Sequence, residues 1–168
     1  MVRTSQVKAA PKRVEGARSI RWTMPAGVTV KRIYGASPLQ RIELVRSGVP
    51  ASFVGSLSQA MKVSRERIYQ TMGLPRATVD RKVREEQALN AYESERVLGL
   101  VQLIGLAEAI VNESGGPKDF DAAAWVGHWL SEPHPVLGGR TPGELMDTSE
   151  GRALVGDLML QQQSGAYG

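Results

Sequence analysis

Cysteine is absent from this chain of 168 residues, and histidine occurs only at positions 128 and 134. A chain without cysteine has no disulfide framework and no thiolate metal site, a composition that suits a reducing cytoplasm. No apolar run approaches the ~20 residues of a membrane span, because Gln102 and Glu108 interrupt the best candidate. The first residues carry charges with no hydrophobic segment behind them, so we expect no signal peptide and a cytoplasmic protein.

Side chains that could build an active site are also scarce. His128, Glu132 and His134 are close in sequence, but Pro133 and Pro135 break the helical spacing that would bring them together. We expect His134 to stabilise a turn. The stretch from Gly138 to Thr141 resembles a phosphate cradle only weakly, because it lacks the lysine and the preceding strand of that motif. The sequence therefore predicts no enzyme, no cofactor and no metal site.

Charge is unevenly distributed along the chain. Residues 1–37 hold 8 Lys or Arg and 1 acid, and residues 38–84 hold 9 and 3. Residues 85–168 hold 4 Lys or Arg and 13 acids, which leaves a net charge of +4 for the whole chain. A basic first half joined to an acidic second half indicates two separate tasks, and a polyanion is the natural partner of the basic part.

Residues 1–37 form a basic arm with no sustained helical period and with several Pro and Gly residues. We expect it to be mostly flexible, although residues 28–33 could pair as a short strand. Two interpretations of the arm stay open: it contacts DNA phosphates, or it is a solubilising tail.

Four short helices are predicted in residues 38–84. Ser37 caps the first, with Gln40 completing a capping box and Leu39, Ile42, Leu44 and Val45 as its apolar set. The second covers residues 51–61 and presents Phe53, Val54, Leu57, Ala60 and Met61. Ser64 caps the third, which ends at Gly73, and Pro75 opens the fourth, which ends near Arg84.

The third and fourth helices have the proportions of a helix-turn-helix, with Gly73 in the turn. The fourth would then read DNA, with polar side chains outside and Val79 and Val83 packed behind. An ordinary helical hairpin with a solvated Arg-rich face is the alternative. The candidate DNA-binding residues are Arg65, Arg76, Thr78, Arg81 and Lys82.

The acidic half begins with a capping box at Asn90 and Glu93, ahead of the longest helix, which ends near Asn112. Its apolar residues cover more than one face, so we expect it to be central and buried by its neighbours on most sides or by a second subunit. Asp119 is placed to cap another helix, which carries Trp125 and Trp129, and these are more often core residues than a ligand platform.

The last 40 residues carry the strongest turn and helix-cap signals in the chain. Gly138 and Gly139 predict a tight turn. Thr141, Pro142 and Glu144 then predict a capped helix. Thr148 caps a final helix, with one face formed by Gly151, Leu154, Val155, Leu158 and Gln162.

This order of residues resembles the C-terminal toxin-binding domain of Xre/MbcA/ParS-type antitoxins. His134 stands where the family usually has Asn, and Met146 replaces a second Leu. Residues 73–81 are similar to the family's Cro-like DNA-reading segment, and residues 93–96 also resemble the family. The matching positions near the C-terminus are Trp129, Leu130, Pro133, Leu137, Gly138, Gly139, Thr141, Pro142, Leu145, Thr148, Gly151, Val155, Leu158, Gly165 and Tyr167.

The resemblance implies an all-α antitoxin of a type II toxin–antitoxin pair, with a Cro-like helix-turn-helix domain at 38–84 and a toxin-binding domain at 85–168. The partner implied is a RES-type toxin that degrades NAD, and promoter DNA would be bound by a homodimer. A stand-alone transcription regulator whose acidic half dimerises or senses a ligand is the rival hypothesis. The candidate toxin-binding residues are Gly138, Gly139, Arg140, Leu158, Gly165, Ala166, Tyr167 and Gly168.

Overall fold

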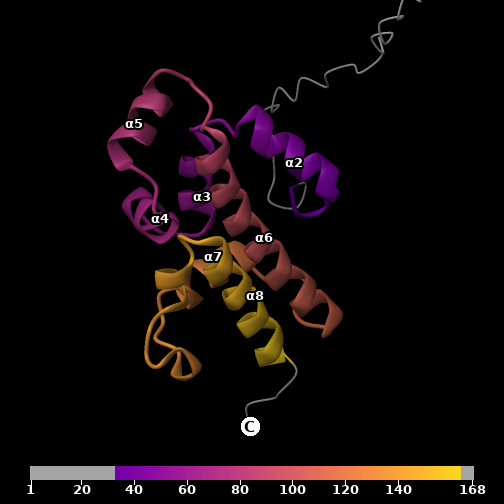
Figure 1. The fold of residues 1–168 in the computed structure, drawn as a ribbon. Coiled ribbons are helices and arrows are strands. Elements are labelled where there is room, and N and C mark those ends of the chain that lie inside the picture. Colours follow the sequence, from indigo (N-terminus) through magenta and orange to yellow (C-terminus); the bar gives the residue numbers. More distant parts are fainter. Residues whose placement is uncertain (1–32, 164–168) are drawn as a thin grey trace, which may run out of the picture.

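The computed structural model describes residues 33–163, and the regular secondary structure of these residues is helical (Figure 1). An isolated β-bridge joins Pro50 to Ala88. The predicted all-α class is confirmed. In chain order, the elements are α2 (Pro38–Ser47), α3 (Phe53–Ala60), α4 (Arg65–Met72), α5 (Arg76–Arg84), α6 (Ala91–Glu113), α7 (Ala122–Trp129), the 3₁₀ turns η1 (Pro135–Leu137) and η2 (Pro142–Leu145), and α8 (Ser149–Gln163).

Side-chain caps define the starts of several helices. The Ser37 hydroxyl accepts the N–H of Gln40, and the Gln40 side chain accepts the N–H of Ser37 at 2.8 Å. Asn90 and Glu93 form the same reciprocal pair at the start of α6, so these two predicted capping boxes are confirmed, whereas the one predicted for Thr141 and Glu144 does not form. Ser64 caps α4, which ends at Gly73 in the left-handed conformation with φ of 58°.

Helix α6 is the central element of the structure. It runs through the middle of the molecule (Figure 1), and α2, α4, α7 and α8 pack against it. The central, buried position predicted for this helix is confirmed. Its buried apolar residues are Val97, Leu98, Leu100, Val101, Leu103, Ile104 and Ala107.

One hydrophobic core joins the basic and acidic parts of the described chain. Met61 and Ile68 of the basic part belong to the same cluster as Val126 and Leu130 of the acidic part. Polar contacts follow the same boundary: Lys62 pairs with Asp121 at 3.0 Å, and Arg67 donates to the Ser131 hydroxyl at 3.1 Å. Because α3 and α4 pack directly against α7 and the turn after it, the two parts hold a fixed relative position.

Several local predictions differ from the structure. Asp121, not Asp119, caps α7, because a turn in which Phe120 donates to Pro117 delays the start of the helix. Residues 142–145 form a 3₁₀ turn, and Thr141 makes no side-chain cap there. Thr148 caps α8 as predicted.

Helix faces also differ in detail from the predicted ones. In α2, Leu44 is buried and Val45 is partly buried, whereas Leu39 is 75% exposed and Ile42 is 44% exposed, because the helix packs on α6 along one side. Ala60 of α3 is exposed as well. The predicted strand at residues 28–33 lies outside the described residues, apart from Ile33, which is buried in a helical turn.

No helix in the described range 33–163 combines the length and the apolar character needed to cross a membrane.

Candidate functional sites

The α4–α5 pair forms the predicted helix-turn-helix geometry. Gly73 turns the chain, and Leu74 and Val79 are buried beneath it at 6% and 0% exposure. Arg96 of α6 donates to the carbonyl oxygens of Met72 and Gly73, at 2.6 and 3.0 Å, and so satisfies the C-terminal end of α4. The start of α5 is therefore held by α4 and by α6.

A buried tyrosine links the middle of α5 to α4. The Tyr69 hydroxyl donates to Asp80 Oδ1 at 2.7 Å, and the ring is 4% exposed. Burial, together with this bond to a carboxylate, raises the pKa of Tyr69 to about 12. At neutral pH the phenol therefore remains protonated and acts as the donor.

Two of the predicted DNA-binding arginines are exposed on α5, and both are paired with acids. Arg76 is 65% exposed and lies 3.3 Å from Glu66 and 3.5 Å from Asp80. Arg81 is 50% exposed and pairs with Glu85 at 2.8 Å. Exposed ion pairs of this kind contribute little stability, so a phosphate group can displace the acids at small cost.

The other predicted DNA-binding residues occupy different environments. Arg65 is exposed at the start of α4, and its guanidinium lies beside Gly55 of α3. Thr78 is half-buried.

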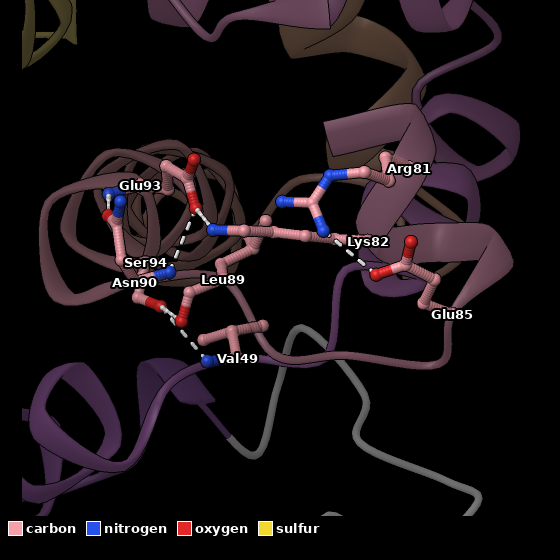
Figure 2. Close-up of polar contacts among 8 residues, drawn as sticks. All are labelled: Val49, Arg81, Lys82, Glu85, Leu89, Asn90, Glu93 and Ser94. Carbon is pink, nitrogen blue, oxygen red and sulfur yellow. Dashed lines mark hydrogen bonds and ion pairs between the residues drawn. The ribbon is translucent and has the colours of Figure 1, made fainter. Parts of the chain in front are cut away.

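Lys82 does not lie on the outer face of α5, and that prediction is wrong. Its side chain is 12% exposed and its Nζ lies 2.5 Å from Glu93 Oε2 of α6 (Figure 2). Lys82 follows the buried Val79 by three residues and so shares the inward face of the helix. Glu93 was not identified as its partner from the sequence, although the capping box already placed its carboxylate at the start of α6.

The predicted toxin-binding loop is a closed turn. Gly138 and Gly139 have φ of 66° and 84°, as their sequence predicted. The N–H of His134 donates to the Arg140 carbonyl at 2.9 Å, and His134 Nδ1 accepts the N–H of Val136 at 3.3 Å. The expected turn-stabilising role of His134 is confirmed, and Gly138, Gly139 and Arg140 are exposed at the turn.

The end of α8 lies next to this turn. Gln162 Nε2 and His134 Nε2 are 2.6 Å apart, so α8 brings the chain to the loop just before its last residues. The candidates Gly165, Ala166, Tyr167 and Gly168 lie outside the described residues.

Leu158 is a core residue and is 2% exposed, which corrects its prediction as a surface contact. Helix α8 packs on α6 through Val155, Leu158 and Met159, and this leaves Leu154 on the outside with 51% exposure. Val136 and Leu160 are also exposed, at 48% and 45%, and sequence reasoning missed both. Trp129 is buried as expected, whereas Trp125, which was also expected in the core, is 38% exposed and stacks on Trp129.

Within residues 33–163, no group of three or more His, Asp or Glu is placed to hold a metal ion. His128 instead lies 3.0 Å from Glu132, one helical turn away on an exposed surface.

Comparison with known proteins identifies both the basic and the acidic part of the chain. Residues 40–102 match the Antitoxin Xre-like helix-turn-helix domain, and residues 107–165 match the Antitoxin Xre/MbcA/ParS C-terminal toxin-binding domain. A curated relative from Sphingobium sp. (strain YBL2), named Prs ADP-ribosylating antitoxin, is 40% identical over 90% of this chain and 96% of its own length. The chain belongs to the Xre/MbcA/ParS antitoxin family.

Two further antitoxins are similar over shorter stretches or at lower identity. Antitoxin Xre of Pseudomonas putida (strain KT2440) is 30% identical over 56% of this chain and 54% of its own length. Antitoxin Xre of Yersinia enterocolitica (strain 8081) is 24% identical over 75% of this chain and 80% of its own length.

This antitoxin therefore has a helix-turn-helix domain followed by a toxin-binding domain, as its sequence predicted. The first match extends to residue 102 and the second begins at residue 107, so α6 contributes to both domains.

Proposed function

We propose that this antitoxin binds a RES-type toxin that consumes NAD and occludes its active site. The similarity to the Sphingobium antitoxin over nearly the full length of both chains carries this proposal. The name of that relative refers to ADP-ribosylation, a reaction that takes its ADP-ribose from NAD. A toxin that uses NAD is therefore consistent with both the family and the relative.

The proposed toxin-binding surface combines the 138–140 turn with the C-terminal tail. Gly138, Gly139 and Arg140 are exposed there, and the Gln162–His134 contact brings the end of α8 beside them. The tail from Gly165 to Gly168 follows α8 in sequence, and Tyr167 would serve as its aromatic anchor. Leu158 is left out because it is buried. The acidic charge of residues 85–168 favours a toxin with basic residues around its substrate site.

The proposed second activity is binding to the promoter of the antitoxin's own operon, in the cytoplasm and as a homodimer. Arg65, Arg76, Thr78 and Arg81 would make the contacts, and the partly buried Lys82 is left out. A dimer presents two copies of α5, which suits a palindromic operator with half-sites one helical turn apart.

Affinity purification from the native host at high salt tests the toxin assignment. We expect a stoichiometric partner that consumes NAD when it is freed from the antitoxin. Its NAD consumption should stop when the antitoxin is added back. Deleting residues 165–168 should weaken this inhibition more than it lowers thermal stability. Recovery of a homo-oligomer without a partner would instead favour the stand-alone transcription regulator. A partner without NAD-consuming activity would overturn the RES assignment.

A gel-shift titration with the promoter duplex tests DNA binding. Replacing both Arg76 and Arg81 with Ala should cost about 1–3 kcal/mol per lost base contact, which is roughly tenfold or more in affinity. Arg46→Ala is the matched control, because Arg46 is 72% exposed on α2 and pairs with Glu43. Toxin binding should survive in both variants, because the replaced side chains are exposed and lie outside the proposed toxin-binding surface. Equal affinity of the double variant and the control would remove α5 as the reader.

A further inference from the structure

We propose that Lys82 is a positioning residue for DNA reading, and that its partly buried ion pair with Glu93 sets the orientation of α5 on the first turn of α6. Promoter affinity would then depend on a contact that does not touch DNA. The inference rests on the proposed promoter binding.

In the Lys82–Glu93 pair, Glu93 is buried and Lys82 is partly buried, and the Glu93 carboxylate also belongs to a helix cap. Lys82 Nζ lies 2.5 Å from Glu93 Oε2, and the side chains are 12% and 2% exposed. The same Oε2 accepts the N–H of Asn90 at 2.8 Å, which fixes the carboxylate at the start of α6 (Figure 2). The lysine is thus held against an anchored group rather than against a mobile side chain.

The connection between α5 and α6 is anchored to the rest of the fold. Leu89 donates its N–H to the Val49 carbonyl at 2.8 Å, and Ala51 donates its N–H to the Gln87 backbone carbonyl at 3.0 Å. Ser94, which is fully buried, accepts the N–H of Val49 at 3.0 Å (Figure 2). The first turn of α6 is therefore a rigid reference for the helix that precedes it.

Helix α5 itself has little packing of its own. Val79 is the residue of α5 that is buried, and Asp80 is tied to Tyr69 of α4. Lys82 adds a tie to α6, two residues further along the helix. Val83, next to Lys82, is partly buried against the core. With contacts to α4 and to α6, α5 is fixed on two sides, and Arg76 and Arg81 are held in one arrangement relative to DNA. Loss of the Lys82 tie leaves Val83 as the remaining side-chain anchor of its second half, so we expect the angle of this half to change.

The test compares Lys82→Met, Glu93→Gln, the double variant and wild type for binding to the promoter duplex over a range of salt concentrations. Glu93→Gln keeps an oxygen that can accept the Asn90 N–H, and the double variant leaves no unpaired buried charge. We expect each variant to lose about tenfold in affinity, a change equivalent to about 1.4 kcal/mol. The slope of log affinity against log salt should stay the same, because no phosphate contact is lost.

Glu93→Gln distinguishes positioning from electrostatics. Removing an acid near DNA would strengthen binding if charge alone mattered, whereas loss of positioning weakens it. Glu85→Gln, which removes the exposed partner of Arg81, is the matched control and should bind as well as wild type or better. Toxin binding and the helical circular dichroism signal should be unchanged in all variants.

Two outcomes would overturn the inference. Wild-type affinity in the folded variants would show that the pair serves stability alone. A loss confined to Lys82→Met with a salt slope smaller by about one would show a direct phosphate contact. If wild type itself fails to bind the promoter, the proposed DNA binding fails, which is a different result from either of these.

Discussion

At the scale of single residues, Asp80 makes two of the side-chain contacts of α5. Its carboxylate accepts the Tyr69 hydroxyl at 2.7 Å and lies 3.5 Å from Arg76. It thereby orders an exposed arginine and joins α5 to α4 at the same point. This double role explains why an acid stands in the middle of a helix that is proposed to approach DNA.

The raised pKa of Tyr69 predicts a loss of stability at alkaline pH. The folded protein holds the phenol proton up to a pKa of about 12, whereas the ordinary value is 10.0. The stabilisation is fully present below pH 10.0 and is lost as pH rises through about 12. Urea unfolding of wild type and Tyr69→Phe should show a stability difference that shrinks across this window. A difference that stays constant up to pH 12 would contradict the assignment.

Among the helices, those with strong local signals were predictable. Ser37 with Gln40, and Asn90 with Glu93, satisfy free N–H groups through their own side chains, so the starts of α2 and α6 depend on nearby sequence. The same holds for the left-handed Gly73 and for the turn at Gly138 and Gly139. The resemblance to antitoxins also identified the two kinds of domain and their order along the chain.

Features set by distant neighbours were not predictable from local patterns. Lys82 is a residue type that often contacts DNA, but the direction of its side chain is set by Glu93, 11 residues away on another helix. Leu154 and Leu158 are both apolar residues of α8, and only the position of α6 decides that Leu158 is the buried one. The regions proposed as sites could be chosen from the sequence, whereas the inward or outward direction of their side chains required the fold.

For the whole molecule, the shared core makes DNA-binding and toxin-binding parts fold as one unit. Gly127 of α7 lies against the backbone of Met61, which follows α3, and a Cβ at this glycine would overlap the Met61 carbonyl oxygen. A side chain there must push the two parts of the molecule apart.

Gly127→Ala should therefore destabilise the entire protein. We expect a loss of about 1–3 kcal/mol in the free energy of unfolding, because a well-packed contact is overfilled. Gly156→Ala is the matched control on α8, where the added Cβ would come no closer than 3.9 Å to Leu106. The control should be neutral or more stable, since alanine favours helix. Thermal unfolding followed by circular dichroism measures both, and equal midpoints for the two variants would argue against a tight α3–α7 contact.

The sharing of α6 between the two family domains constrains how such antitoxins exchange partners. A recombination event that replaced residues 107–165 alone would split this helix. It would also leave Met61 facing a different α7 and Arg67 facing a different residue at position 131. A successful chimera has to bring the matching residues of α3 and α4 with the new toxin-binding domain. We therefore expect toxin specificity to be transferable only together with the part of the helix-turn-helix domain that packs against α7.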